Sequence, residues 1–254
     1  MENYKFLKIL QEQDVLYVGL NRPQSRNAFN EHLIEELTHA FSNIPEDILV
    51  VILYGEGDSF CAGADLDWMK RMGESSFEEN RKSAYLMWKM YETIDSCSCV
   101  LISKVHGYVL GGGMGLISCC DIVISEEGAK FGWTEVKLGL VPAVVSTFSI
   151  RKVNDSYARR YFLTGEIFDS YTAKHMGLVH EVVKHENLDE KVNEFIKIIR
   201  KNGKNGIKLT KQLLTKLRPR TDKEIIDYCI ETISRARSSQ EALSRINAFL
   251  NRGP

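Results

Sequence analysis

Glu135 is the acidic side chain whose surroundings best fit proton transfer. It lies in the segment Phe131–Gly139, between Trp133 and a mostly apolar stretch. Apolar surroundings raise the pKa of a carboxyl group, so that it can exchange protons near neutral pH. The other interpretation is a carboxylate in the first turn of a helix capped by Thr134, and the residues alone favour this structural role.

A glycine-rich run, Gly111–Gly115, is the most distinctive motif of the chain. It follows the apolar segment Val100–Val105 and precedes Leu116-Ile117, a pattern that predicts a strand, a tight turn and a helix start. Glycine permits a positive φ and lets the main chain approach a ligand closely. Because N–H groups at a helix N-terminus stabilise negative charge, the run predicts oriented amide donors.

A second strand is predicted for residues 49–54, and it leads to the segment Phe60–Asp65. Two strand ends that each deliver backbone N–H groups could polarise one carbonyl oxygen between them. Asp65 follows Gly63-Ala64, and we expect it to cap the helix predicted from Asp65 to Met72 rather than to act in catalysis.

Large apolar side chains on this short helix form a possible ligand surface. Trp68, Met69 and Met72 fall at i, i+1 and i+4, on one helical face. They could line an acyl pocket together with Trp133, although an apolar stripe of this kind is more often plain core.

His106 and the cysteines do not form a recognisable reactive motif. His106 has no serine or cysteine nucleophile motif beside it, so a hydrogen-bonded structural role is expected. The G-x-S-x-G elbow of α/β-hydrolases, the P-loop and the G-x-G-x-x-G fingerprint are all absent from the sequence. The six cysteines lack C-x-x-C spacing, which argues against zinc and for reduced, partly buried thiols.

Composition is that of an ordinary globular protein. The chain has 254 residues, 44% of them hydrophobic, and a formal net charge of −1, so no overall field favours nucleic acid or membrane. The N-terminal residues lack the basic and apolar regions of a signal peptide, and no segment approaches the roughly 20 apolar residues that span a bilayer. We therefore expect a cytoplasmic protein, with an organelle matrix as the alternative.

A basic segment runs from Phe195 to Thr221 without any acidic residue. Its usual interpretation is a solvated helix face. Docking of a phosphorylated ligand, such as a nucleotide tail, is the sharper interpretation. Nucleic-acid binding ranks third because no aromatic residues alternate with the charges. The charged residues are Lys197, Arg200, Lys201, Lys204, Lys208, Lys211, Lys216, Arg218 and Arg220.

Strands alternate with helices in the first two-thirds of the chain, which predicts an α/β core. Helices are expected at residues 188–199, 207–217 and 223–249, the second and third separated by Arg218-Pro219. We divide the chain into a core at residues 1–195 and a helical region at residues 196–254.

Taken together, these motifs resemble the crotonase, or enoyl-CoA hydratase/isomerase, superfamily over nearly the whole chain. The resemblance rests on Asn21-Arg22-Pro23, Arg26–Asn30, Phe60–Leu66, Gly107 with Gly111–Gly113, Asp121-Ile122, Thr134-Glu135, Gly139–Pro142, Leu163–Gly165, Ala173 and Gly177–Val179. It implies a spiral of ββα units with a helical C-terminal region that forms trimers, often paired into hexamers.

The resemblance also implies an acyl-CoA thioester substrate, with coenzyme A as part of the substrate and no separate cofactor or metal. Glu135 matches one of two catalytic glutamates of the family. The two N–H groups that hold the thioester oxygen fall on Ala64 and Gly112. The positions that hold coenzyme A fall on Arg26, Ala28, Ala62, Gly63, Ala64, Asp65 and Leu66.

Two departures from the family pattern bear on the reaction. Gly115 stands where family hydratases have their second glutamate, and Pro142 is followed by Ala143-Val144-Val145 instead of a glycine-rich run. Both departures are similar to bacterial 3-methylglutaconyl-CoA hydratases of leucine breakdown. Hydration of a 2-enoyl-CoA is therefore the favoured hypothesis. A Δ3,Δ2-enoyl-CoA isomerase with one glutamate, and a non-catalytic family member that binds RNA, are the alternatives.

Overall fold

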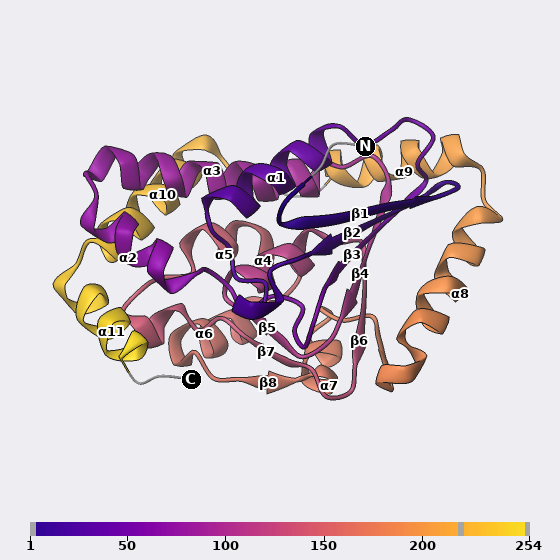
Figure 1. The fold of residues 1–254 in the computed structure, drawn as a ribbon. Coiled ribbons are helices and arrows are strands. Elements are labelled where there is room, and N and C mark those ends of the chain that lie inside the picture. Colours follow the sequence, from indigo (N-terminus) through magenta and orange to yellow (C-terminus); the bar gives the residue numbers. More distant parts are fainter. Residues whose placement is uncertain (1–3, 218–220, 252–254) are drawn as a thin grey trace.

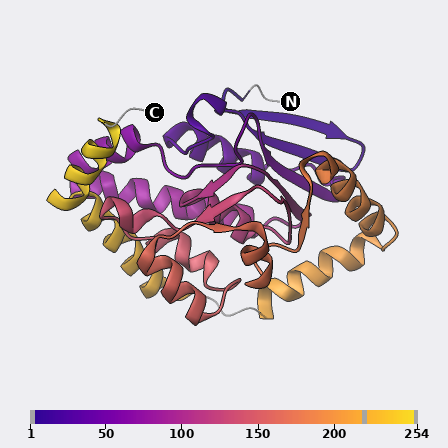
Figure 2. The ribbon, with the colours of Figure 1, turned by 90° about the horizontal axis from the view of Figure 1, so that it is seen from below.

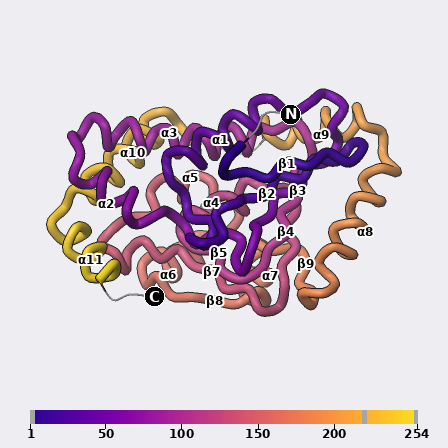
Figure 3. Tube along the Cα trace, in the orientation of Figure 1, coloured from indigo at the N-terminus to yellow at the C-terminus, as the bar shows by residue number. Residues whose placement is uncertain are grey.

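Residues 4–217 and 221–251 are described by the computed structural model of the protein. A six-stranded sheet, in the order β1-β2-β3-β4-β6-β9, forms its centre (Figures 1 and 3). In this sheet β1 and β2 are antiparallel, and the other neighbouring strands are parallel to each other. The strands are β1 (Leu7–Glu12), β2 (Val15–Leu20), β3 (Val50–Gly55), β4 (Val100–Val105), β6 (Ile122–Glu126) and β9 (Glu181–Val183).

A smaller sheet, in the order β5-β7-β8, continues the path of the chain below the first sheet in Figure 1. Its strands are β5 (Tyr108–Leu110), β7 (Lys130–Gly132) and β8 (Phe168–Asp169). β5 and β7 are parallel, and β7 and β8 are antiparallel. Because β5 follows β4 after only two residues, this sheet begins at the carboxyl edge of the large one.

Helices surround both sheets. The helices of the first two-thirds are α1 (Glu31–Ser42), α2 (Leu66–Glu74), α3 (Phe77–Asp95), α4 (Gly112–Cys119), α5 (Ala143–Ser149), α6 (Asp155–Thr164) and α7 (Ser170–His175). The C-terminal helices are α8 (Leu188–Arg200), α9 (Lys204–Leu217), α10 (Lys223–Arg237) and α11 (Gln240–Leu250). The described ranges also contain the 3-10 turns η1 (Pro23–Ser25), η2 (Glu135–Leu138) and η3 (His185–Asn187).

The large sheet is buried on both faces, as its apolar parallel strands require. Val51 and Leu53 of β3 point to the main core, where α1, α3 and α4 pack. Val50 and Ile52 alternate with them and point to a second apolar cluster formed with α8. Figure 2 shows α8 on the opposite side of the sheet from α1 and α3. The predicted α/β core with C-terminal helices is confirmed.

Strands β3 and β4 begin and end close to the predicted residues, and each delivers a loop to the same edge of the sheet. His106 lies directly after β4, where its Nε2 donates to the carbonyl of Gly57 at 2.7 Å. The expected structural role of this histidine is confirmed. No helix within the described ranges is long and apolar enough to cross a bilayer.

The prediction of a single helix over residues 223–249 is wrong, because the structure has two helices in this segment. α10 ends at Arg237, and Ser239 caps α11 by accepting the N–H of Ala242 at 3.1 Å. Serine favours this local bond over continued helix, which explains the break. The predicted domain division at residue 195 falls within α8 and stays a prediction. Arg218, Pro219 and Arg220 lie outside the described residues.

Candidate active site

The loops that follow β3 and β4 are joined by main-chain hydrogen bonds. Cys61 donates to the carbonyl of Tyr108 at 3.0 Å, and Leu110 donates to the carbonyl of Cys61 at 3.0 Å. On the other side of the first loop, Phe29 donates to the carbonyl of Gly63 at 2.7 Å. The segment around Gly63 is therefore fixed between two others that are distant in sequence.

The N–H groups of Ala64 and Gly112 lie at the junction of these loops. Gly63 and Gly111 have φ values of 101° and 46°, which glycine adopts readily. A Cβ on Gly63 would lie 3.5 Å from the nitrogen of Gly112, so the two loops are in close contact. Among the described residues, neither Ala64 nor Gly112 donates its N–H to a main-chain acceptor. Two free donors of this kind can stabilise negative charge on a single oxygen.

Glu135 is the first residue of η2, and its carboxylate lies at the same junction. A Cβ on Gly111 would be 3.4 Å from Oε1 of Glu135 and 3.8 Å from Cα of Gly63. Oε2 is buried and has no hydrogen-bond partner within the described part of the chain. Burial raises the pKa of Glu135 to about 7. The alternative placement is confirmed in part: Glu135 lies in the first turn of η2 with Thr134 at the N-cap position, but the Thr134 side chain makes no capping bond.

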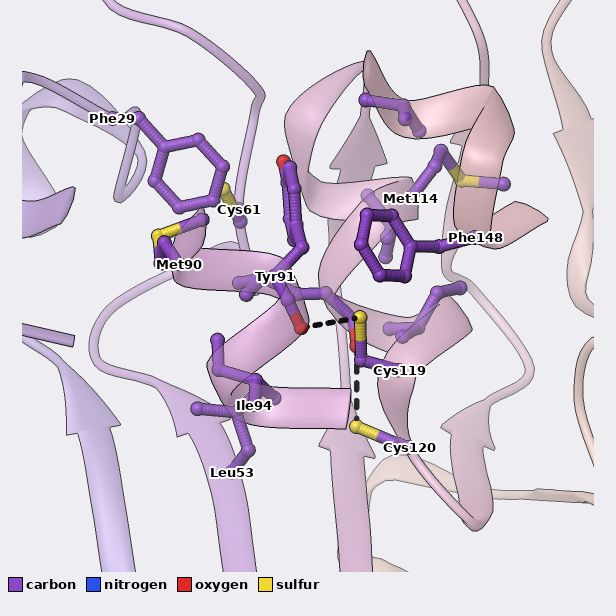
Figure 4. Packing of buried hydrophobic residues seen from close by; sticks show 14 of the residues in the cluster. Phe29, Leu53, Cys61, Met90, Tyr91, Ile94, Met114, Cys119, Cys120 and Phe148 are labelled. Carbon is purple, nitrogen blue, oxygen red and sulfur yellow. Dashed lines mark hydrogen bonds between the residues drawn. The ribbon is translucent and has the colours of Figure 1, made fainter. Parts of the chain in front are cut away.

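Tyr91 fills the space beside Gly115, where the family pattern has a second glutamate. A Cβ on Gly115 would lie 2.6 Å from Cζ of Tyr91 and 2.9 Å from its hydroxyl. The hydroxyl donates to the carbonyl of Gly112 at 2.8 Å. Figure 4 shows the ring standing between Phe29 and Phe148 in the core. Because the ring takes this space, glycine is the residue that position 115 can hold without movement of Tyr91.

Asp65 has the structural role that was expected, and a second one. Its Oδ1 accepts the N–H groups of Asp67 and Trp68 at 3.1 and 3.2 Å, which caps α2. Its Oδ2 pairs with Arg22 at 2.9 Å, and Arg22 also donates to the carbonyl of Ala28. The cap therefore ties the start of α2 to the segment that contains Ala28.

The two segments predicted to hold coenzyme A lie side by side. Ala62 donates to the carbonyl of Arg26 at 2.9 Å, which aligns residues 26–28 with residues 62–66. Arg26 is exposed, and its guanidinium lies 5.2 Å from the ring centre of Tyr108. Ala28 and Gly63 are buried, whereas Ala62, Ala64, Asp65 and Leu66 are partly exposed.

The predicted pocket residues fall into two places. Trp68 and Met69 are buried on α2 and Met72 is partly exposed there, close to Arg237 of α10, whose guanidinium lies 5.3 Å from the Trp68 ring centre. Trp133 is also buried, but it packs among Phe162 and Phe168 and donates from Nε1 to Ser149. The surroundings of Trp133 are those of core.

Asn27 helps to build the site, although the sequence predicted no role for it beyond its place in the motif Arg26–Asn30. Its Oδ1 accepts the N–H of Arg22 at 2.8 Å, and its Nδ2 donates to the carbonyls of Glu56 and Ser59 at 2.9 and 2.8 Å. It is fully buried with a φ of 56°. Asparagine tolerates this left-handed conformation better than most residues, and this preference is the sequence feature that could have indicated the role of Asn27. Tyr91 and Arg237 carried no comparable local signal.

Comparisons with known proteins agree with this fold. The architecture defines an α/β protein of the crotonase type, as the sequence predicted. A family model described as Enoyl-CoA hydratase/isomerase matches residues 11–254. The chain therefore belongs to the enoyl-CoA hydratase/isomerase family.

Curated relatives cover most of the chain. A crotonyl-CoA hydratase from Syntrophomonas wolfei is 32% identical over 212 residues, which cover 82% of this chain and 80% of that protein. A short-chain-enoyl-CoA hydratase from Clostridium acetobutylicum is 34% identical over 209 residues, which cover 81% of this chain and 79% of that protein. These likenesses extend across both loops of the site.

Solved structures match the fold as a whole. The crystal structure of an enoyl-CoA hydratase from Shewanella pealeana has a TM-score of 0.80 and 34% identity, and the match covers 98% of this chain and 94% of that one. The structure of an enoyl-CoA hydratase from Bacillus halodurans has a TM-score of 0.87 at 24% identity, covering 96% and 100% of the two chains. At that identity the second match supports the fold alone.

We predict that Gly115→Ala lowers the free energy of unfolding by roughly 1–3 kcal/mol, because the new methyl group clashes with Tyr91. Urea unfolding followed by circular dichroism measures the change. Gly128→Ala is the matched control, since the nearest atom to its Cβ lies 3.7 Å away. Equal stability of the two variants would show that Tyr91 does not restrict position 115.

We also predict a pH-dependent stability difference between the wild type and Glu135→Gln. The raised pKa means that Glu135 contributes stability below about pH 4.5, and that this contribution is lost as the pH rises through about 7. The wild type should therefore lose roughly 2 kcal/mol relative to the variant between pH 5 and pH 8. Parallel pH profiles in urea unfolding would contradict the burial of the carboxylate.

Proposed function

We propose that the protein is an enzyme that adds water across the 2,3-double bond of a 2-enoyl-CoA. The observation that carries the proposal is the carboxylate of Glu135, with a pKa of about 7, at the junction of Gly63 and Gly111. The free N–H groups of Ala64 and Gly112 lie beside it. The hydratase names of the relatives from Syntrophomonas wolfei and Clostridium acetobutylicum support the same reaction.

The proposed reaction passes through a thioester enolate. The thioester oxygen accepts the N–H groups of Ala64 and Gly112, each of which stabilises the developing charge by roughly 3–4 kcal/mol. Glu135 takes a proton from water as the water oxygen bonds to Cβ, and then gives a proton to Cα. One carboxyl group can carry out both transfers in sequence, because its pKa lies close to neutral pH.

Coenzyme A is proposed to lie along the paired segments 26–28 and 62–66. Arg26 is the exposed cation of this surface, and it suits the phosphate groups of the ligand. Among acyl groups, we propose that 3-methylglutaconyl-CoA is a substrate, with a place in leucine breakdown. The pattern of Gly115 and of Ala143-Val144-Val145 supports this choice over a general hydratase.

Isomerisation of a 3-enoyl-CoA is the second candidate. It requires one carboxyl group, which would move a proton between C2 and C4. The space beside Gly115 that a second glutamate would need is filled by Tyr91, which supports a reaction with Glu135 alone. RNA binding has less support, because Arg200 pairs with Asp14 and Lys211 pairs with Asp121 within the basic segment.

We predict that the wild type hydrates crotonyl-CoA and 3-methylglutaconyl-CoA, and that Glu135→Gln lowers kcat/KM by about 100-fold or more because the proton carrier is lost. Loss of the absorbance of the conjugated double bond measures hydration. Glu186→Gln, at an exposed carboxylate on η3, should keep full activity.

Three outcomes would count against this assignment. Migration of the double bond in 3-hexenoyl-CoA, with no hydration of either 2-enoyl substrate, would establish the isomerase instead. Full activity of Glu135→Gln would refute the role of Glu135 in both reactions. Salt-dependent RNA binding with no turnover of any acyl-CoA would favour the third hypothesis.

Self-association is proposed for the outer face of α9. Leu209, Leu213, Leu214 and Leu217 are 54–72% exposed, and their spacing places them on one side of the helix. An apolar stripe of this size is typical of an interface. It supports a trimer, or a pair of trimers, built through the C-terminal region.

We predict that replacing Leu213 and Leu217 by glutamate yields monomers, because charges cannot be buried in an apolar contact without a partner. Light scattering during size exclusion measures the mass of each species. Gln212→Glu adds a charge at an exposed position of the same helix and should leave the assembly intact. A monomeric wild type would refute the interface.

A further inference from the structure

Arg22, directly before η1, is a largely buried cation whose guanidinium joins two segments of the proposed site. Its side chain is 11% exposed, and Cζ lies 5.6 Å from the ring centre of Phe6. Nη1 donates to the carbonyl of Ala28, and Nη2 donates to Oδ2 of Asp65 at 2.9 Å. Hydrogen bonds from a charged donor are stronger than those between neutral groups, and burial strengthens them further. The guanidinium is therefore a fixed positive charge beside the loop that carries Ala64.

The peptide group between Ala28 and Phe29 is held at both ends. Its carbonyl accepts from Arg22, and its N–H donates to the carbonyl of Gly63 at 2.7 Å. The C=O and N–H of a trans peptide point in opposite directions, so the two hydrogen bonds lie on opposite sides of one planar group. A positive charge at the carbonyl end polarises this group and strengthens its N–H as a donor.

The peptide group between Gly63 and Ala64 repeats this arrangement. Its carbonyl accepts from Phe29, and the N–H on the other side of the same trans peptide is that of Ala64. The N–H of Ala64 therefore points away from Phe29. Because the Gly63 segment lies between Phe29 and the chain that follows β4, this N–H points to the side of Gly112. That direction is the one required of a donor that shares an oxygen with Gly112.

A second hydrogen bond to Phe29 fixes the other side of Ala64. The N–H of Asp65 donates to the carbonyl of Phe29 at 2.7 Å, so both peptide groups that flank Ala64 are bound to one residue. The carboxylate of Asp65 lies one residue from the donor, where its charge would repel a developing oxyanion. The ion pair with Arg22 at 2.9 Å balances that charge. Arg22 thus acts on both ends of the contact between Phe29 and Ala64.

We infer that Arg22 is a positioning residue that strengthens the N–H of Ala64 as a donor to the thioester oxygen. The route runs from the guanidinium through the peptide groups 28–29 and 63–64, which one hydrogen bond links. The inference rests on the proposed acyl-CoA function and adds a residue that acts on the enolate without touching it. Because an enolate oxygen carries more charge than a thioester oxygen, the loss of Arg22 should fall mainly on kcat.

Infrared spectroscopy of a bound, unreactive thioester tests this inference. Butyryl-CoA, isotope-labelled at the thioester carbonyl carbon, has no double bond to hydrate, and its carbonyl stretch falls in frequency as hydrogen bonds to the oxygen strengthen. The wild type should lower the stretch relative to the ligand in water. Arg22→Met should keep about half of this downshift, because the Gly112 donor remains while the Ala64 donor is weakened. A downshift equal to that of the wild type would overturn the inference.

Turnover of crotonyl-CoA gives the second readout. Arg22→Met should lower kcat about tenfold and change KM by less than about threefold. Arg22→Lys keeps a charge but can bind only one of the two acceptors, and it should give intermediate values of kcat and of the downshift. Arg71→Met is the matched control, because Arg71 of α2 pairs with Glu31 of α1 at 2.8 Å and bonds to neither peptide group. This variant should match the wild type in both readouts.

The same measurements separate a structural role and the proposed function from the inference. If circular dichroism shows that Arg22→Met does not fold, a wild-type downshift in Arg22→Lys would overturn the inference. Lower stability with wild-type kcat and downshift in a folded variant would show that Arg22 is only structural. A downshift that depends on Arg22, without hydration of any 2-enoyl-CoA, would overturn the hydratase and leave the inference intact. No downshift in the wild type would place the thioester elsewhere and overturn both.

Discussion

Pairing of Cys61 with the main chain of β5 is the constraint on which the site depends. Its two hydrogen bonds, to Tyr108 and from Leu110, hold the loop after β3 against the chain after β4. Asn27 anchors the same loop from the other side through the carbonyls of Glu56 and Ser59. Because the contacts are made by main-chain atoms and one buried amide, the donors at Ala64 and Gly112 are oriented before any ligand binds.

Tyr91 links this constraint to the core. Burial raises its pKa well above the ordinary value, so the phenol keeps its proton and donates to the carbonyl of Gly112. The bond fixes the carbonyl of Gly112, the first residue of α4, while the ring excludes any side chain from Gly115. A single aromatic residue therefore both rigidifies one amide donor and removes the second acid–base group. In the proposed reaction the acid–base chemistry therefore falls on Glu135.

Much of the fold could be predicted from the sequence, and the reasons are local. Alternating burial on β3 and the apolar run of β4 are visible as patterns of neighbouring residues, as is the cap provided by Asp65. Glu135 was visible as an acid in apolar surroundings, but the same residues favoured a helix terminus. Its position beside Gly111 depends on contacts between segments more than 20 residues apart, which no local pattern encodes.

The features that sequence reasoning missed are of the same long-range kind. Arg237 lies in an ordinary amphipathic helix, and its burial results from the packing of α10 against α2, where its guanidinium lies over the Trp68 ring. The break between α10 and α11 depends on two serines whose helical neighbours gave no stop signal, yet it decides where that arginine ends its helix. Proteins tolerate such costly groups mainly where binding requires them. Glu135 and Arg237 each keep at least one buried polar atom without a partner among the described residues. For Glu135, an unsatisfied carboxylate oxygen beside the amide donors of Ala64 and Gly112 fits proton exchange with a bound substrate, as proposed, better than it fits a core built for stability alone.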